Sequence, residues 1–346
     1  MRFLKFKSFF LFLFLINPIM VLGDLAPERL SQTGLYLDIV SKTVYPQNRY
    51  FSPQYPLWTD GALKKRWIQL PEGTKINTSD INYWNFPNGT KLWKEFSFKQ
   101  ADGSLKRIET RLMEKLPDGK WNFSTYLWNE NETEATLATE DGVPNYYNIN
   151  EQVTYDIPSK KACVFCHQQN ESDPVLGFSA LQISPLRDPD AIHGTPLTPE
   201  MLTLDSLQSS DLVTHPVSTW PQIVYSEENP LQKKMFGYFH GNCASCHNPR
   251  GSVRFLNLSL RHKVGTQFAN KESTYVTAVG VKTQDFQIPE LYSGESFYLK
   301  PGDPDASAIL YRMKANNLHH MPPIGTKIVD TVGVEILQEY IKKFLM

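Results

Sequence analysis

Cysteines and histidines in this 346-residue chain form two short motifs of the pattern C-x-x-C-H. The six residues are Cys163, Cys166 and His167 in the first motif and Cys243, Cys246 and His247 in the second. Together the motifs use all four cysteines of the chain. In this pattern the two thiols can add to the vinyl groups of a haem, and the adjacent imidazole can bind its iron. The spacing therefore predicts two covalently bound haem c groups.

Disulfide bonds and zinc are the two other uses of paired cysteines. A bridge within C-x-x-C closes a very short loop and constrains little of the unfolded chain. Bridges between the two pairs stay possible from sequence alone, but they leave both histidines unexplained. Two-pair zinc modules usually separate their pairs by roughly 15–20 residues, whereas Cys166 and Cys243 are much further apart. Haem attachment accounts for all six residues, and we adopt that interpretation.

The first 23 residues have the pattern of a secretory signal peptide. A basic start is followed by the uncharged run FFLFLFLINPIMVL, and Val21 and Gly23 place small residues before a cut ahead of Asp24. The run is short for a membrane span, so an uncleaved anchor is the less favoured alternative. We expect an exported, periplasmic protein with no stable membrane insertion after cleavage.

The mature chain is expected to be mildly acidic. Removal of the three basic residues in the signal peptide leaves 32 Lys and Arg against 36 Asp and Glu, a formal charge of −4 with neutral histidines. Nucleic-acid binding normally needs a basic patch, so we expect no nucleic-acid partner. A mature chain of about 320 residues is long enough for two or three domains.

Residues 24–158 are predicted to form a β-rich, mostly antiparallel domain. The runs KLWKEFSFK and KRIETRLMEKL mix aromatic and β-branched residues with polar ones, and the sequences QADGS and LPDGK that follow them are hairpin signals. Six of the seven tryptophans fall in this region. We interpret them as sheet and core packing, with a carbohydrate-binding platform as the less favoured alternative.

The remainder of the chain changes character twice. Residues 159–227 are rich in proline and poor in periodicity, which predicts a first haem-binding segment with loops and short helices. Residues 228–346 are predicted to be helical, because Met235 and Phe239 precede the second motif at helical spacing. Asp330 can cap a closing helix against which Phe239 would pack. The expected fold class is α+β multidomain, with a β-domain, a haem-bearing linker and a C-terminal all-α domain.

The C-terminal sequence PGDPDASAILYRM, followed by HHMPPIGTKIVDTVGVEILQEYI, resembles the end of bacterial class I cytochrome c domains. From about residue 35 to its end, the chain resembles a family of periplasmic dihaem c-type cytochromes with an N-terminal β-domain. The other phrases that carry the resemblance are YPLWTDGALKKRWIQLP, WNFPNGTKLWKEF, IETRLMEK, YLWNENETEA, YDIPSKKACVFCH and YFHGNCASCHNPRGS. The resemblance implies an electron carrier that passes single electrons between redox partner proteins.

For the second haem, the resemblance implies His247 as the proximal ligand and Met321 as the distal ligand. Class I cytochromes take this methionine from a loop shortly before the last helix, and Met321 has that position. A thioether ligand raises the reduction potential relative to a second histidine. His319 and His320 are the nearby competitors.

The first haem has His167 as its proximal ligand, and its distal ligand is less well defined. We favour His193, which lies in a proline-flanked loop, while His215, Met201 and an open position are alternatives. Two six-coordinate haems favour an electron carrier, whereas an open first haem favours a dihaem redox enzyme of the peroxidase type. Two further histidines are expected to be structural or solvent-facing, namely His240 and His262.

Overall fold

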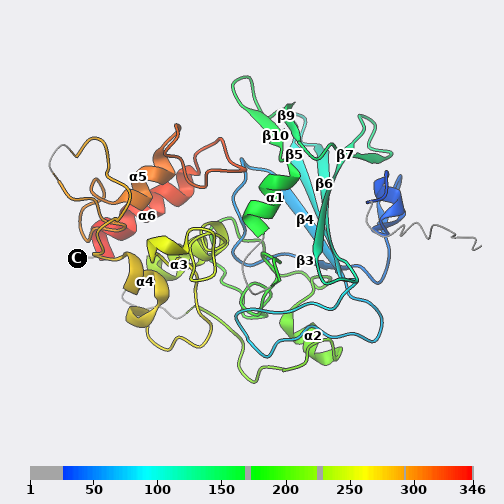
Figure 1. Ribbon diagram of the computed structural model, residues 1–346, viewed down its shortest axis with the longest axis horizontal. Helices are drawn as coiled ribbons and strands as arrows, with labels where there is room; N and C mark the ends of the chain where they lie inside the picture. The colour runs from blue at the N-terminus through cyan, green and yellow to red at the C-terminus, as the bar shows by residue number, and fades with distance from the viewer. Residues whose placement is uncertain (1–25, 168–172, 224–228, 292–293, 345–346) are drawn as a thin grey trace, which may run out of the picture.

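The computed structural model describes residues 26–167, 173–223, 229–291 and 294–344, and the predicted signal peptide lies outside these ranges. The N-terminal part contains a six-stranded antiparallel sheet, and the C-terminal part is helical (Figure 1). The α+β prediction is confirmed at this level. No helix within the described ranges is long and apolar enough to cross a membrane.

The large sheet pairs each strand with the next one along the chain, and every pair is antiparallel. Its strands are β3 (Arg49–Phe51), β4 (Leu63–Gln69), β5 (Lys91–Lys99), β6 (Leu105–Lys115), β7 (Trp121–Trp128) and β8 (Ala135–Leu137). Gly103 and Gly119 turn the chain between the three longest strands with φ of 86° and 84°. Glycine adopts this left-handed conformation without steric penalty, so the hairpins predicted at QADGS and LPDGK are confirmed.

Both faces of the sheet are covered. Successive side chains of a strand point to opposite faces, and one face carries Trp67, Trp93 and Trp128, over which Leu30 and Tyr36 pack. This face is a tryptophan-rich core, as the sequence predicted for most of these residues. The opposite face looks toward the helical part of the chain.

Smaller elements surround the large sheet in the first half of the chain. β1 pairs with β2 and β9 pairs with β10, both in antiparallel fashion. These elements are the 3-10 helix η1 (Leu30–Gln32), β1 (Tyr36–Asp38), β2 (Thr43–Val44), β9 (Val143–Asn148) and β10 (Thr154–Ile157).

From residue 160 onward, the regular elements named in the described ranges are helices, and long irregular segments separate them. The first of them, α1, lies beside the sheet, whereas α3, α5 and α6 lie together away from it (Figure 1). The elements are α1 (Lys160–His167), α2 (Leu204–Ser209), α3 (Pro230–Asn242), η2 (Arg254–Leu256), η3 (Ala269–Lys271), α4 (Ser273–Ala278), α5 (Ala308–Lys314) and α6 (Thr331–Phe344).

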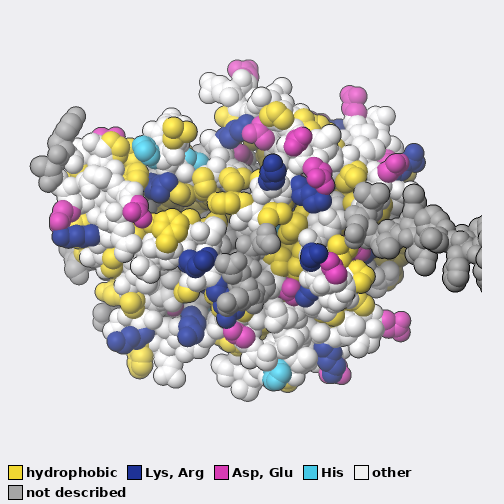
Figure 2. All heavy atoms as spheres, in the orientation of Figure 1, with side chains coloured by type: hydrophobic (Ala, Val, Ile, Leu, Met, Phe, Trp, Pro, Cys, Tyr) yellow, Lys and Arg dark blue, Asp and Glu magenta, His cyan; other side chains and the backbone are white. Residues whose placement is uncertain are grey.

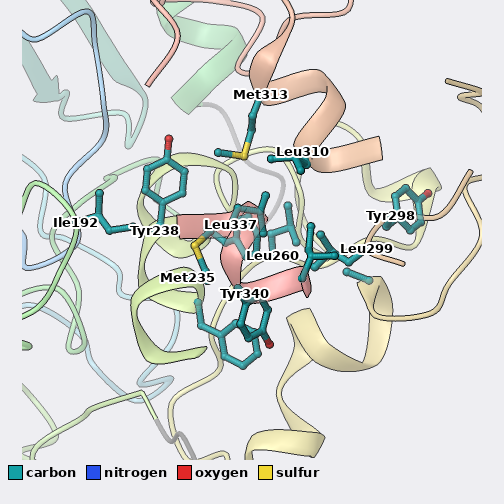
Figure 3. Packing of buried hydrophobic residues seen from close by; sticks show 14 of the residues in the cluster. Ile192, Met235, Tyr238, Leu260, Tyr298, Leu299, Leu310, Met313, Leu337 and Tyr340 are labelled. Atoms are coloured by element: carbon teal, nitrogen blue, oxygen red, sulfur yellow. The ribbon is translucent and has the colours of Figure 1, made fainter. Parts of the chain in front are cut away.

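The core of the helical part forms where α3 meets α6 (Figure 3). The rings of Phe236 and Tyr340 meet edge to face with their centroids 6.4 Å apart. Phe239 lies in the same buried cluster as Leu337 and Ile341. The packing predicted between the helix before the second motif and the closing helix is therefore confirmed.

The closing helix also begins where the sequence predicted. The backbone N–H of Gly333 donates to Asp330 Oδ1 at 3.2 Å, which satisfies one of the free donors in the first turn of α6. Asp330 also accepts a hydrogen bond from His193 Nε2 at 2.8 Å. The cap of α6 is thereby tied to the segment that follows the first motif.

The loop between β3 and β4 joins the sheet to the helical part. Trp58 donates its backbone N–H to Asn242 Oδ1 at 2.7 Å and its indole N–H to the carbonyl of Ile328 at 3.1 Å. Tyr55 lies against α3 at Gly237, where an added Cβ would overlap with the tyrosine ring. A close backbone approach thus fixes the two parts against each other.

Candidate functional site

A cavity of about 700 Å³ lies between the sheet and the helical part. Figure 2 shows apolar side chains gathered in a band across the middle of the molecule, between these two parts. The volume falls within the range of about 300–1,000 Å³ that is typical of small-molecule and cofactor sites. Both C-x-x-C-H motifs contribute all of their chemical groups to its wall, namely Cys163, Cys166, His167, Cys243, Cys246 and His247.

The first motif lies on α1, beside β7. The His167 ring is 5.6 Å from the Phe123 ring, and its Nδ1 donates to the carbonyl of Pro174 at 2.9 Å. With the proton on Nδ1, the Nε2 lone pair is free to bind a metal. Burial lowers the pKa of His167 to about 4, so the imidazole is neutral at pH 7, which is the form that binds iron.

The second motif follows directly on α3. The backbone N–H of His247 donates to the carbonyl of Cys243 at 3.0 Å, which keeps the motif in a helical turn. Burial, assisted by the charge of Arg312, lowers the pKa of His247 to about 4. Its Nδ1 is buried without a hydrogen-bond partner in the described part of the chain. This imidazole is therefore also neutral at pH 7.

The four cysteines are unpaired. Burial raises the pKa of Cys166 to about 11 and that of Cys243 to about 12, and the charge of Cys246 contributes to both shifts. All four cysteines line the same cavity, so the two motifs come together although they are distant in sequence. The surroundings favour uncharged sulfur, the form present in a thioether.

Met321 lines the same cavity as the second motif. Its backbone N–H donates to the carbonyl of Arg312 at 3.0 Å, which anchors the loop to α5. Both ring nitrogens of His320 are engaged, Nδ1 with Ala315 O at 2.7 Å and Nε2 with Thr326 Oγ1 at 2.9 Å. Within the described residues, His319 and His320 are absent from the cavity wall, so the local geometry favours Met321 over both.

The three residues considered as distal ligands of the first haem are absent from the cavity wall, as far as the described ranges show. The His193 ring lies tilted against Trp58 with ring centroids 4.8 Å apart, and iron binding through its Nε2 would require its contact with Asp330 to break. Met201 is buried beside Arg187. His215 is exposed. The ligand role of His193 stays a prediction.

His240 is a cavity residue for which the sequence predicted only a structural or solvent-facing role. It lies on α3 and lines the cavity, and its Nδ1 is buried without a hydrogen-bond partner in the described part of the chain. Burial lowers the pKa of His240 well below its usual value, so the ring is neutral. The available signal was its position one helical turn before Cys243. His262, in contrast, pairs with Glu272 at 3.0 Å in the interior, in keeping with a structural role.

These groups fit covalently bound haem. Paired uncharged thiols, neutral imidazoles and a methionine sulfur line one largely apolar cavity of cofactor size. Comparisons of the chain with protein-family models, with curated proteins and with solved structures found no match.

Proposed function

We propose that this protein is an exported dihaem c-type cytochrome that transfers single electrons between redox partner proteins. The main support for the proposal is that the cysteines and histidines of both C-x-x-C-H motifs line one largely apolar cavity. A disulfide scaffold leaves both histidines unexplained. The described residues contain no group of three or more His, Cys, Asp or Glu side chains placed to hold a metal ion, which argues against a zinc module. Residues 159–227 would then form the first haem-binding segment, and residues 228–346 a class I cytochrome c-like domain.

When bound, each haem c supplies a one-electron Fe(III)/Fe(II) couple. Cys163 and Cys166 would hold one group and Cys243 and Cys246 the other. His167 is poised for its role because the carbonyl of Pro174 keeps the proton on Nδ1. With both haems held, the protein would accept one electron from a reduced partner and pass one to an oxidised partner, with no bond made or broken in a substrate.

The cavity wall supports the electron-transfer role because its lining is largely apolar. Apolar surroundings limit reorganisation around a charge that changes by one unit. Because both cysteine pairs line the same cavity, the two haems that they would hold could exchange an electron. Export to the periplasm is part of the proposal and is supported by the signal-peptide pattern of residues 1–23.

Haem content tests the proposal. The full chain, produced in a bacterial host with a cytochrome c maturation system, is expected to carry two covalent haems by mass spectrometry and by the pyridine haemochrome assay. The double variant Cys163→Ala/Cys166→Ala should retain one haem, and so should Cys243→Ala/Cys246→Ala. A purified protein without covalent haem, or one that binds zinc stoichiometrically instead, would rule the proposal out.

A second candidate function is a dihaem redox enzyme with an open position at the first haem. It is favoured by the location of His193, His215 and Met201 outside the cavity wall of the described structure. Low-temperature EPR separates the two functions, since an open ferric haem is high-spin and binds cyanide. Low-spin signals from both haems, with no reaction toward peroxide, would support the electron carrier.

A further inference from the structure

Three basic side chains form a row across the sheet on the face that lines the cavity. Arg66 of β4 is directly opposite Lys94 of β5, and Lys94 is directly opposite Arg111 of β6. Directly paired residues of antiparallel strands point to the same face, and all three residues line the cavity. Like charges in directly opposed positions destabilise a sheet, so the row calls for compensating negative charge.

The described residues supply little of that charge. Arg111 pairs with Glu109. Within the described ranges, Arg66 and Lys94 have no acidic partner, and the Lys94 ammonium lies 4.8 Å from the centre of the Phe96 ring. The Glu109 carboxylate, at the Arg111 end of the row, is therefore the one ion-pair partner that the described residues give to the three basic side chains.

The excess of positive charge is unfavourable because the row faces the interior of the protein. Arg66 is only 6% exposed, and burial lowers its pKa to about 10. Burial, followed by the charges of Arg66 and Arg111, lowers the pKa of Lys94 well below its usual value. Burying a charge without a partner is strongly unfavourable. An anion in the cavity beside Arg66 and Lys94 would remove this penalty.

Three acidic residues of the described structure line the cavity. Asp285 belongs to the helical part, between α4 and α5, and the other two have partners elsewhere. Asp60 Oδ1 accepts the backbone N–H groups of Lys327 and Ile328 at 2.8 Å each, and Asp156 pairs with the Lys327 ammonium at 2.7 Å. They serve the loop that follows Met321 and leave the row uncompensated. The missing negative charge is therefore expected to come with the occupant of the cavity.

The row also has a direction relative to the first motif. The first motif lies against β7, where the Phe123 ring is 5.6 Å from the His167 ring, and β6 is the next strand of the sheet. Arg111 of β6 is therefore the end of the row nearest the first motif. Arg66 lies two strands beyond Arg111, about 10 Å away at the usual spacing between neighbouring strands. Haem carries its two propionates on the edge remote from the vinyl groups that the thiols attack. Carboxylates are thus expected at the end of the row remote from Cys163.

We propose that Arg66 and Lys94 bind the propionate carboxylates of the haem held by Cys163 and Cys166. This inference rests on the proposed function. Guanidinium binds carboxylate through paired hydrogen bonds, and ammonium adds a second positive charge. The large sheet then acts as a wall of the first haem site as well as a scaffold.

The test uses Arg66→Met and Lys94→Met in the full holoprotein, with Lys65→Met as the matched control. Lys65 is exposed and adjacent to Arg66 on the same strand, so it points to the opposite face of the sheet. Both cavity variants are expected to shift a propionate bending band in the resonance Raman spectrum. They should also lower one of the two midpoint potentials, because loss of nearby positive charge favours the ferric state. Lys65→Met should change neither property.

A free carboxylate is the other source of the same chemistry, and acetate serves as its probe. Acetate is expected to leave the absorption spectrum of the wild-type holoprotein unchanged. A saturable acetate effect that Arg66→Met abolishes would overturn the proposal in favour of a free anion. Unchanged Raman bands and potentials in both cavity variants with two haems bound would overturn it as well, whereas absence of covalent haem would count against the proposed function itself.

If the methionine variants do not yield folded protein, Arg66→Lys provides the test. It keeps the charge and removes the paired hydrogen bonds, so it should still shift the propionate band while altering the potential less. An unchanged band in that variant, with both haems bound, would overturn the proposal.

Discussion

Met321 gives the most direct test of the proposed second haem site. In Met321→Ala the ferric holoprotein is expected to lose the red charge-transfer band that marks methionine–iron bonding. One midpoint potential should fall, because the thioether favours the ferrous state. Met313 also lines the cavity, so Met313→Leu is the matched control and should keep the band. Retention of the band in Met321→Ala would remove Met321 from the ligand set.

His240 and His193 give a paired test of the first haem. His240 offers a neutral, cavity-facing imidazole, whereas the Nε2 of His193 is engaged by Asp330. We therefore expect His240→Ala to convert one low-spin ferric haem to a high-spin form that binds cyanide, and His193→Ala to leave the spin state unchanged. EPR of the two variants decides between the residues. The reverse outcome would restore His193, and high-spin signal in the wild type would favour the enzyme.

The difference between these two histidines shows what a sequence can predict at the residue scale. C-x-x-C-H is a local pattern, so all six of its residues can be recognised from the sequence alone. A distal ligand is chosen by which chain segment folds over the cavity, and no short motif encodes that. His193 is plausible from its loop, yet the loop packs onto Trp58 and the α6 cap. His240 belongs to a helix whose sequence pattern indicates apolar packing, and the sign available from the sequence was its position one helical turn before Cys243.

At the scale of elements, local sequence patterns were enough to predict the main hairpins and helices. Asp-Gly turns located the β5–β6 and β6–β7 hairpins, and helical spacing located α3 and α6. The row of Arg66, Lys94 and Arg111 could not be predicted from the sequence. It depends on the register of three strands and on which face of the sheet lines the cavity. Each strand taken alone shows only an ordinary mixture of apolar and basic residues.

The cap of α6 makes a stability prediction at this scale. Burial opposes ionisation of Asp330, but the hydrogen bond and charge of His193 and the N–H of Gly333 lower its pKa overall. A carboxylate with a lowered folded pKa stabilises the fold above its unfolded value of about 3.9, and that contribution is lost as pH falls through the lower folded pKa. Asp330→Asn is expected to reduce the free energy of unfolding at pH 7 by about 0.5–2 kcal/mol, the usual range for a helix cap.

Urea denaturation of the holoprotein between pH 7 and pH 3 measures both effects. The loss caused by Asp330→Asn should shrink toward the acidic end of the range. Asp305 is exposed, so Asp305→Asn is the control and should have little effect at any pH. A pH-independent loss in Asp330→Asn would show that the carboxylate charge is not what stabilises the cap.

At the scale of the whole molecule, the candidate site exists because two structurally different parts meet. The first motif lies beside the sheet and the second at the end of α3, and the β3–β4 loop holds the parts together through Trp58. Sequence spacing assigned each motif to its own segment and said nothing about a shared cavity. The close approach of Tyr55 to α3 is therefore as important to the site as the motifs, since it sets the distance between them.

Gly237 tests that dependence. Its Cβ would overlap with the Tyr55 ring, so in Gly237→Ala either α3 or the Tyr55 side chain of the β3–β4 loop must shift. We expect a loss of about 1–3 kcal/mol in the free energy of unfolding, the usual effect of overpacking, together with a shift in both midpoint potentials as the cavity opens to water. Gly294 would make only ordinary contacts as alanine, so Gly294→Ala should change neither quantity appreciably. Wild-type stability and potentials in Gly237→Ala would show that the two parts can separate at this contact without disturbing the site, and that other contacts of the β3–β4 loop, such as those of Trp58, hold the cavity closed.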